Sequence, residues 1–208
     1  MQKLARSLVA VGLLLAAVGI AAIGEAQTPS CRTALLIIDV QSAWLGSAAI
    51  TTDDVLIQDK TAEIAASARA GGVPVVFVID VGHRDMFSDE ELELAEPLEV
   101  LAGDFVVEKT SQNGFLRTNL EEVLRAMGAT TVLVTGYASH ECVAQTAKGA
   151  AMKGFEVIII EDGHSGGAGG QWASRQNTSW RDRGWQVTPS GEIDFARLCV
   201  PSNSEEGV

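Results

Sequence analysis

The sequence predicts one α/β domain, a three-layer α-β-α sandwich around a six-stranded, mostly parallel sheet. Short, uniformly apolar runs alternate with segments in which apolar residues recur at helical spacing. Uniformly apolar strands are typical of parallel sheets, because helices cover both faces of such sheets. With 47% hydrophobic and 20% charged residues in a chain of 208, the composition fits a folded unit of single-domain size.

The strands and helices are expected to alternate along the chain. The expected strands are residues 34–38, 75–79, 105–107, 131–135, 157–160 and 185–188. The expected helices are residues 53–70, 118–127, 142–153 and 171–183, with a short helix near 88–95. Thr118 and Glu121 are placed to form a capping box at the start of the second helix. The glycine-rich stretch 163–170 lacks the Lys-Ser/Thr ending of a phosphate loop, so we expect a surface loop, with a mobile lid as the alternative.

The first 26 residues are expected to be a signal peptide that precedes a single domain over residues 27–208. Lys3 and Arg6 precede an uncharged apolar run over residues 8–23, and small residues follow at 24 and 26. This layout is typical of secretory signals and predicts a periplasmic or secreted protein. An uncleaved membrane anchor is the alternative, since the run is only slightly short of a full span.

The net charge restricts the expected classes of binding partner, and the cysteine content bears on the expected disulfide. With 27 acidic and 15 basic residues the formal net charge is −12, which disfavours nucleic acid and, once the signal is removed, stable membrane association. In an oxidising compartment three cysteines suggest one bridge and one free thiol. Cys31 and Cys199 lie near the two ends of the domain and are the expected pair; two unpaired thiols remain the alternative.

Reactive side chains follow several of the expected strands, where parallel sheets place their ligands. Asp39, Lys109 and Cys142 come after the first, third and fourth strands, while Asp80 and His83 follow the second. A helix N-terminus and a neighbouring ammonium both lower the pKa of a thiol, and a carboxylate can receive its proton. Taken singly, each residue has an ordinary alternative: a core cysteine, an aspartate that caps a turn, or a solvated lysine.

Three segments in this order resemble the motifs of the isochorismatase-like cysteine hydrolases, a family that includes nicotinamidases, carbamoylsarcosine amidohydrolases and streptothricin-hydrolase-like enzymes. The segments are ALLIIDVQ (34–41), VVEKTSQNGF (106–115) and VTGYASHECVAQTA (134–147). The later EDGHSG (161–166) and WQVTPSGEIDF (185–195) are also similar to this group. The resemblance covers nearly all of residues 33–195 and implies the family's Rossmann-like sheet.

The resemblance also implies roles for individual residues. Asp39 matches the carboxylate that accepts the thiol proton, Lys109 the ammonium that stabilises the thiolate, and Cys142 the nucleophile. The backbone N–H groups of Ala138 and Cys142 match the oxyanion hole, which in the family is accompanied by a cis bond at the position of Tyr137–Ala138. Such a donor typically contributes about 10²–10³ in rate.

The chain departs from the family's metal-binding members. Those carry Asp-x-His after the second strand, whereas this chain has Asp80 and His83 one residue further apart, so we expect no metal and no cofactor. Trp44, Phe115 and Tyr137 are the candidates for substrate contact in the pocket wall, and an ordinary core tryptophan is the alternative for Trp44.

The leading function is hydrolysis of a C–N bond in a small amide, lactam or carbamoyl compound through an acyl-enzyme. An isochorismatase-type enol-ether hydrolase and a catalytically silent binding or assembly protein on the same scaffold are the alternatives. The intact acid, base and thiol set favours the first. A small-molecule substrate is the expected partner, and the resemblance implies a homo-oligomer.

Overall fold

A computed structural model describes residues 31–45, 49–167 and 170–199 of the chain. The described elements, in chain order, are β1 (Thr33–Ile38), η1 (Ser42–Trp44), α1 (Ile57–Ala70), β2 (Val75–Asp80), β3 (Phe105–Lys109), α2 (Leu120–Ala126), β4 (Thr131–Tyr137), α3 (Cys142–Met152), β5 (Glu156–Ser165), α4 (Gln171–Asp182), β6 (Gln186–Thr188), η2 (Ser190–Glu192) and α5 (Phe195–Leu198).

The six strands form one sheet in the order β3-β2-β1-β4-β5-β6, and each neighbouring pair is parallel. The chain runs outward from β1 through β2 to β3, then returns to β4 on the other side of β1. The strand order therefore reverses between β1 and β4. In open α/β sheets this reversal leaves a crevice at the carboxyl ends of the two strands, where ligands bind.

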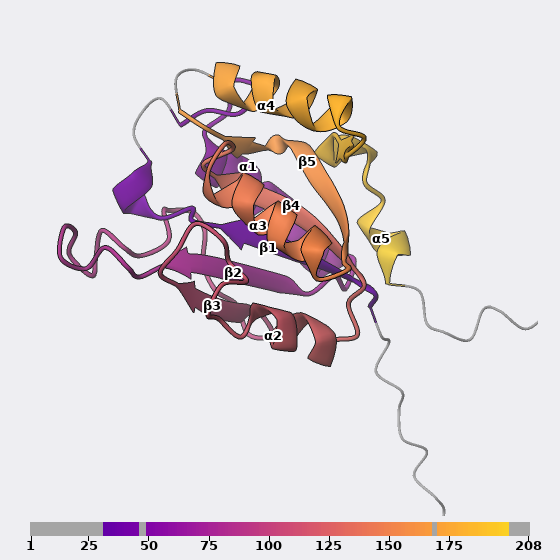
Figure 1. Cartoon of the computed structure of the whole chain (residues 1–208), viewed down its shortest axis with the longest axis horizontal. Helices are drawn as coiled ribbons and strands as arrows, with labels where there is room; N and C mark the ends of the chain where they lie inside the picture. Colours follow the sequence, from indigo (N-terminus) through magenta and orange to yellow (C-terminus); the bar gives the residue numbers. More distant parts are fainter. Residues whose placement is uncertain (1–30, 46–48, 168–169, 200–208) are drawn as a thin grey trace, which may run out of the picture.

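The sheet has an apolar core on each face, which confirms the three-layer prediction. Alternate residues of β1 and β2 point to opposite faces, with Leu36 and Val76 in one cluster and Leu35 and Phe77 in the other. Buried residues of α2, α3 and α4 complete the first cluster, and those of α1 and α5 complete the second. Figure 1 shows α3 crossing in front of the sheet and α1 lying behind it.

Some expected helix bounds are wrong, each for a local reason. The first helix begins at Ile57 rather than residue 53, because Asp54 has a φ of +57° and Ile50 bridges Leu56. The expected short helix near 88–95 is absent from the described structure; Leu94 instead bridges Gln41.

The predicted capping box at Thr118 is also absent. The α2 helix begins at Leu120, whose N–H donates to the Thr118 hydroxyl. Glu121 turns outward and pairs with Lys153 at 2.6 Å instead of reaching back to the chain before it. The ion pair of Glu121 with Lys153, the residue after α3, thus replaces the capping contact that the sequence pattern predicts.

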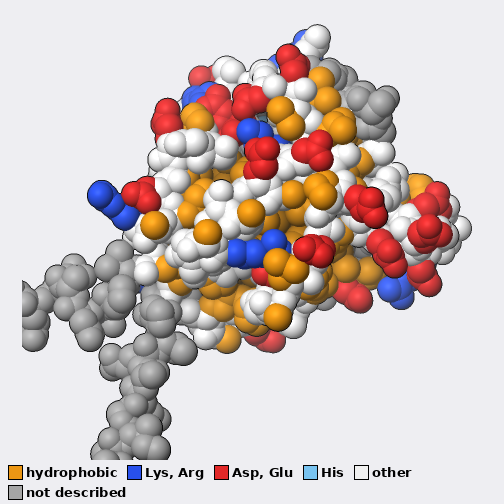
Figure 2. Space-filling view, turned by 180° about the vertical axis from the view of Figure 1, so that it is seen from behind, with side chains coloured by type: hydrophobic (Ala, Val, Ile, Leu, Met, Phe, Trp, Pro, Cys, Tyr) orange, Lys and Arg blue, Asp and Glu red, His pale blue; other side chains and the backbone are white. Residues whose placement is uncertain are grey.

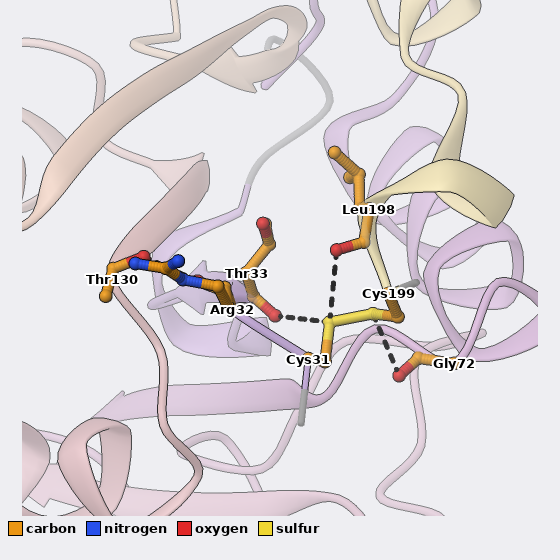
Figure 3. Close-up of a disulfide and its surroundings, with 7 residues drawn as sticks. All are labelled: Cys31, Arg32, Thr33, Gly72, Thr130, Leu198 and Cys199. Atoms are coloured by element: carbon orange, nitrogen blue, oxygen red, sulfur yellow. Dashed lines mark hydrogen bonds between the residues drawn. A yellow bond between two sulfur atoms is a disulfide. The ribbon is translucent and has the colours of Figure 1, made fainter. Parts of the chain in front are cut away.

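A disulfide joins Cys31 to Cys199, which confirms the expected pairing (Figure 3). It ties Cys31, two residues before β1, to the residue directly after α5, and 168 positions separate the two along the chain. The expected signal peptide, residues 1–26, lies outside the described residues, so export stays a prediction. Among the described helices, none has the length and apolarity needed to cross a bilayer.

Removal of the cross-link is expected to destabilise the domain. The Cys31→Ser/Cys199→Ser variant should lose about 2–4 kcal/mol of unfolding free energy, because the open chain gains conformational freedom when it unfolds. Urea denaturation followed by circular dichroism measures this loss. Dithiothreitol should lower the midpoint of the wild type and leave that of the double variant unchanged; equal midpoints for the oxidised wild type and the variant would contradict the expectation.

Candidate active site

A pocket of about 350 Å³ opens at the carboxyl ends of β1, β2 and β4, where the strand order reverses. Its lining residues are Asp39, Trp44, Asp80, His83, Thr110, Ser111, Gln112, Tyr137, Ala138, Glu141 and Cys142. A larger hollow of about 770 Å³ lies at the opposite ends of the strands, beside Cys31, Val75 and Phe105. The smaller pocket is the candidate site, because the reactive side chains expected from the sequence gather there.

Lys109 lies at the centre of this group. Its Nζ is 2.7 Å from Asp39 Oδ2, 3.3 Å from Asp80 Oδ2 and 3.6 Å from Cys142 Sγ. The Lys109 side chain is 0% exposed. A buried ammonium is tolerated only when it is paired, and here two carboxylates pair with it.

Asp39 leaves β1 with its backbone bent back toward the pocket. Its φ is +50°, a left-handed conformation that aspartate tolerates better than most residues. Its N–H donates to the Val78 carbonyl, which holds the bend against β2. One carboxylate oxygen, Oδ2, is paired with Lys109, while Oδ1 is buried and has no hydrogen-bond partner among the described residues. The carboxylate therefore keeps one oxygen available for a proton.

The nucleophile candidate, Cys142, is the first residue of α3 and lines the pocket. The peptide bond Tyr137–Ala138 is cis, as the resemblance implies. No backbone acceptor is described for the N–H of Ala138 or of Cys142. The first N–H groups of a helix have no partner within it, so the Cys142 amide is free to stabilise negative charge.

Close contact between β1 and β4 depends on Gly136. Its φ is +123°, and a Cβ at this position would lie 2.1 Å from the Ile38 carbonyl oxygen. Only glycine fits here. This contact brings the end of β4, and hence the loop before Cys142, beside Asp39 at the end of β1.

A buried polar chain holds the same loop from behind. Ser139 Oγ lies 2.8 Å from His164 Nδ1, and His164 Nε2 lies 2.9 Å from Asn177 Oδ1. The Asn177 amide donates to the Glu161 carbonyl, so its oxygen must accept from His164 Nε2–H. His164 Nδ1 then accepts from the Ser139 hydroxyl. Burial lowers the pKa of His164 to about 4, so the ring stays neutral and this order of donors persists.

The thiol is more strongly protonated than the sequence indicates. Burial and the Asp39 carboxylate raise the pKa of Cys142 to about 12, and Lys109 only partly offsets them. The pKa expected from the sequence was a lowered one, so this expectation is wrong. Burial also raises the pKa of Asp39 to about 6, against the opposing effect of Lys109. At neutral pH the resting pair is a thiol beside a carboxylate, which suits proton transfer during attack rather than before it.

Lys109 stays charged beside this pair. Burial alone would lower its pKa, but Asp39, Cys142 and Asp80 outweigh that effect and raise it.

The structure brings most of the expected site residues together and adds two. Trp44 and Tyr137 line the pocket, whereas Phe115 is buried in the core, 5.9 Å from the Phe155 ring, so its expected place in the pocket wall is wrong. Asp80 and His83 join the site: Asp80 Oδ1 lies 3.2 Å from His83 Nδ1. The position of Asp80 directly after the second apolar run places it at this edge, but its contact with Lys109 depends on the register of β2 against β3.

The spacing of Asp80 and His83 was expected to exclude a metal. Within residues 31–45, 49–167 and 170–199, no group of three or more His, Cys, Asp or Glu side chains is placed to hold a metal ion.

Residues 33–188 match the sequence model of the Isochorismatase domain family. A streptothricin hydrolase from Streptomyces noursei is 35% identical over 135 residues, which are 64% of this chain and 49% of the relative. The chain thus spans about half the length of that relative.

Two solved structures share the fold. An N-carbamoylsarcosine amidase from Thermoplasma acidophilum is 27% identical with a TM-score of 0.65, over 78% of this chain and 99% of that one. A cysteine hydrolase from Pseudomonas syringae pv. phaseolicola 1448A has a TM-score of 0.70 at 22% identity, over 83% of this chain and 95% of that one.

The charges of Asp39 and Lys109 are expected to shift the pKa of the Cys142 thiol in opposite directions. Asp39→Asn removes a negative charge and should lower the pKa of Cys142, whereas Lys109→Met should raise it further. The ultraviolet absorbance of the thiolate, titrated against pH with Cys142→Ser as the blank, measures both. A thiol pKa that is unchanged in Asp39→Asn would contradict this arrangement.

Proposed function

The chain belongs to the isochorismatase family, and we propose that it hydrolyses a C–N bond of a small amide, lactam or carbamoyl compound through Cys142. The observation that carries the proposal is the position of Lys109 Nζ, 2.7 Å from Asp39 and 3.6 Å from the Cys142 sulfur at the pocket. The carboxylate can accept the thiol proton and the ammonium can stabilise the thiolate, so the two groups together can activate the thiol as a nucleophile.

In the first step Cys142 attacks the carbonyl carbon while its proton passes to Asp39. Lys109 stabilises the sulfur's negative charge as the S–H bond breaks. The carbonyl oxygen becomes an oxyanion that the N–H groups of Ala138 and Cys142 stabilise. The C–N bond then breaks, the nitrogen takes the proton from Asp39, and an acyl-thioester remains on Cys142.

In the second step water removes the acyl group. Asp39, again a carboxylate, accepts a proton from the water as its oxygen attacks the thioester carbon. The same two N–H groups stabilise the second oxyanion. When the C–S bond breaks, the sulfur recovers the proton from Asp39 and a carboxylic or carbamic acid is released.

Two findings support C–N hydrolysis over other reactions on this fold. One solved relative is an amidase by name, and a second relative is named a hydrolase of streptothricin. The raised pKa of Cys142 does not oppose the proposal, because the ionised Asp39 beside the thiol removes the proton as the new bond forms.

The proposal is tested by incubating the purified protein with a panel of amides, lactams and carbamoyl compounds and detecting released ammonia or amine. We expect turnover by the wild type and a loss of at least about 10³-fold in Cys142→Ala, since the covalent step disappears. Turnover that survives in Cys142→Ala would remove the covalent mechanism. Cleavage of enol ethers without any amide turnover would show that the protein is an enol-ether hydrolase instead of a C–N hydrolase.

The pH profile of kcat/KM provides a second readout of the same reaction. Asp39 must be ionised to accept the proton, and its pKa is about 6, so kcat/KM should rise as pH increases through about 6 and fall away below it. Asp39→Asn should retain only residual turnover without this acidic limb. An acidic limb that persists in Asp39→Asn would assign the base to another group.

A further inference from the structure

We propose that the substrate of this pocket carries a positive charge near the scissile bond, and that the pocket discriminates against carboxylates. The inference rests on the proposed function for the identity of the reaction. The charge preference itself comes from the lining of the pocket, which favours a cation whatever bond is broken.

Among the residues that the structure describes, three carboxylates and one histidine line the pocket, and no lysine or arginine does. The acidic residues are Asp39, Asp80 and Glu141, and the histidine is His83. Asp39 and Asp80 are almost fully buried, with side chains 4% and 7% exposed, whereas Glu141 is half exposed at 53%. Two carboxylates therefore lie at the floor of the pocket and a third lies at its rim.

Lys109 does not offset this acidity for a ligand. Its side chain is 0% exposed, and its Nζ is held between Asp39 Oδ2 at 2.7 Å and Asp80 Oδ2 at 3.3 Å. A substrate carboxylate could reach this ammonium only by displacing a buried carboxylate, which would then lose its own partner.

The protonation of His83 does not change the sign of the pocket. Its Nδ1 lies 3.2 Å from Asp80, so an imidazolium there would be matched to a charge already present. The pocket then holds three carboxylates, one ammonium and at most one imidazolium, so its net charge stays negative. Transfer of a proton from Cys142 to Asp39 also leaves the total unchanged, because the thiolate replaces the carboxylate.

The uncharged part of the wall suits a cation as well. Trp44 and Tyr137 line the pocket, and Trp44 packs edge-on against His83 and Phe87 at 5.1 and 5.0 Å. An ammonium or guanidinium near an aromatic face is attracted by the ring's quadrupole.

The test measures how fast Cys142 reacts with three methanethiosulfonates of similar size. The reagents carry 2-aminoethyl, ethyl or 2-sulfonatoethyl groups, and each forms a mixed disulfide with the thiolate and releases methanesulfinate. Cys142 is the free cysteine of the described chain, so mass spectrometry reports on this residue. Each rate is divided by that of the same reagent with 2-mercaptoethanol, and the high thiol pKa cancels from ratios between reagents.

We expect the normalised rates to fall in the order cationic, neutral, anionic, with the cationic reagent at least about tenfold faster than the anionic one. Glu141→Gln should reduce this ratio about threefold or more, because it removes the exposed charge at the rim. High salt should narrow the ratio in the wild type.

The control separates the pocket from the protein's overall charge. Acidic side chains are also spread over the face seen in Figure 2. Glu122→Gln on α2 changes the net charge by the same amount at an exposed position outside the pocket lining, and it should leave the ratio unchanged. Equal normalised rates for the three reagents, a faster anionic reagent, or equal effects of Glu141→Gln and Glu122→Gln would overturn the inference.

The outcome is independent of catalysis. Cation-selective labelling without turnover of any amide would defeat the proposed function and leave the charge preference standing. Amide turnover with unselective labelling would do the reverse.

Discussion

The burial of one ammonium organises the site. Lys109 is removed from water at the end of β3, and its charge is compensated by Asp39 from β1 and Asp80 from β2. An uncompensated charge in this position would cost several kcal/mol, so the sheet must bring both carboxylates to the same point. Cys142 enters the group because Gly136 lets β4 lie close against β1. The carboxyl ends of β1, β2 and β3 and the N-terminus of α3 therefore meet at the Lys109 ammonium.

In this arrangement the proposed reaction depends on Asp39 as a base rather than on a preformed Cys142 thiolate. Burial that makes Lys109 hold its partners tightly also raises the pKa of Cys142 to about 12 and that of Asp39 to about 6. In the proposed reaction the thiol therefore stays S–H until the carbonyl group of the substrate arrives. A protonated sulfur also resists oxidation, because oxidants attack the thiolate.

The sequence was sufficient for the features that follow from strand pattern and missed those that depend on packing. The apolar runs predict the strands, and the shared edge of a parallel sheet predicts that Asp39, Lys109 and Cys142 meet. Asp80 was assigned no role, because its contact with Lys109 requires the register of β2 against β3. The place of Phe115 depends on how its loop turns into the core, and the thiol's pKa depends on the depth of burial. Neither is visible in a linear pattern.

The central claim, that Asp39 and Lys109 form one energetically coupled unit, is tested most directly by a double-mutant cycle on the free energy of unfolding. Asp39→Asn, Lys109→Met and the double variant are compared with the wild type by urea denaturation at neutral pH. The account predicts that the two changes are non-additive by at least about 1.5 kcal/mol, because Asp39→Asn leaves Lys109 with Asp80 alone and Lys109→Met leaves two buried carboxylates without their cation. Additivity to within about 0.5 kcal/mol would contradict it.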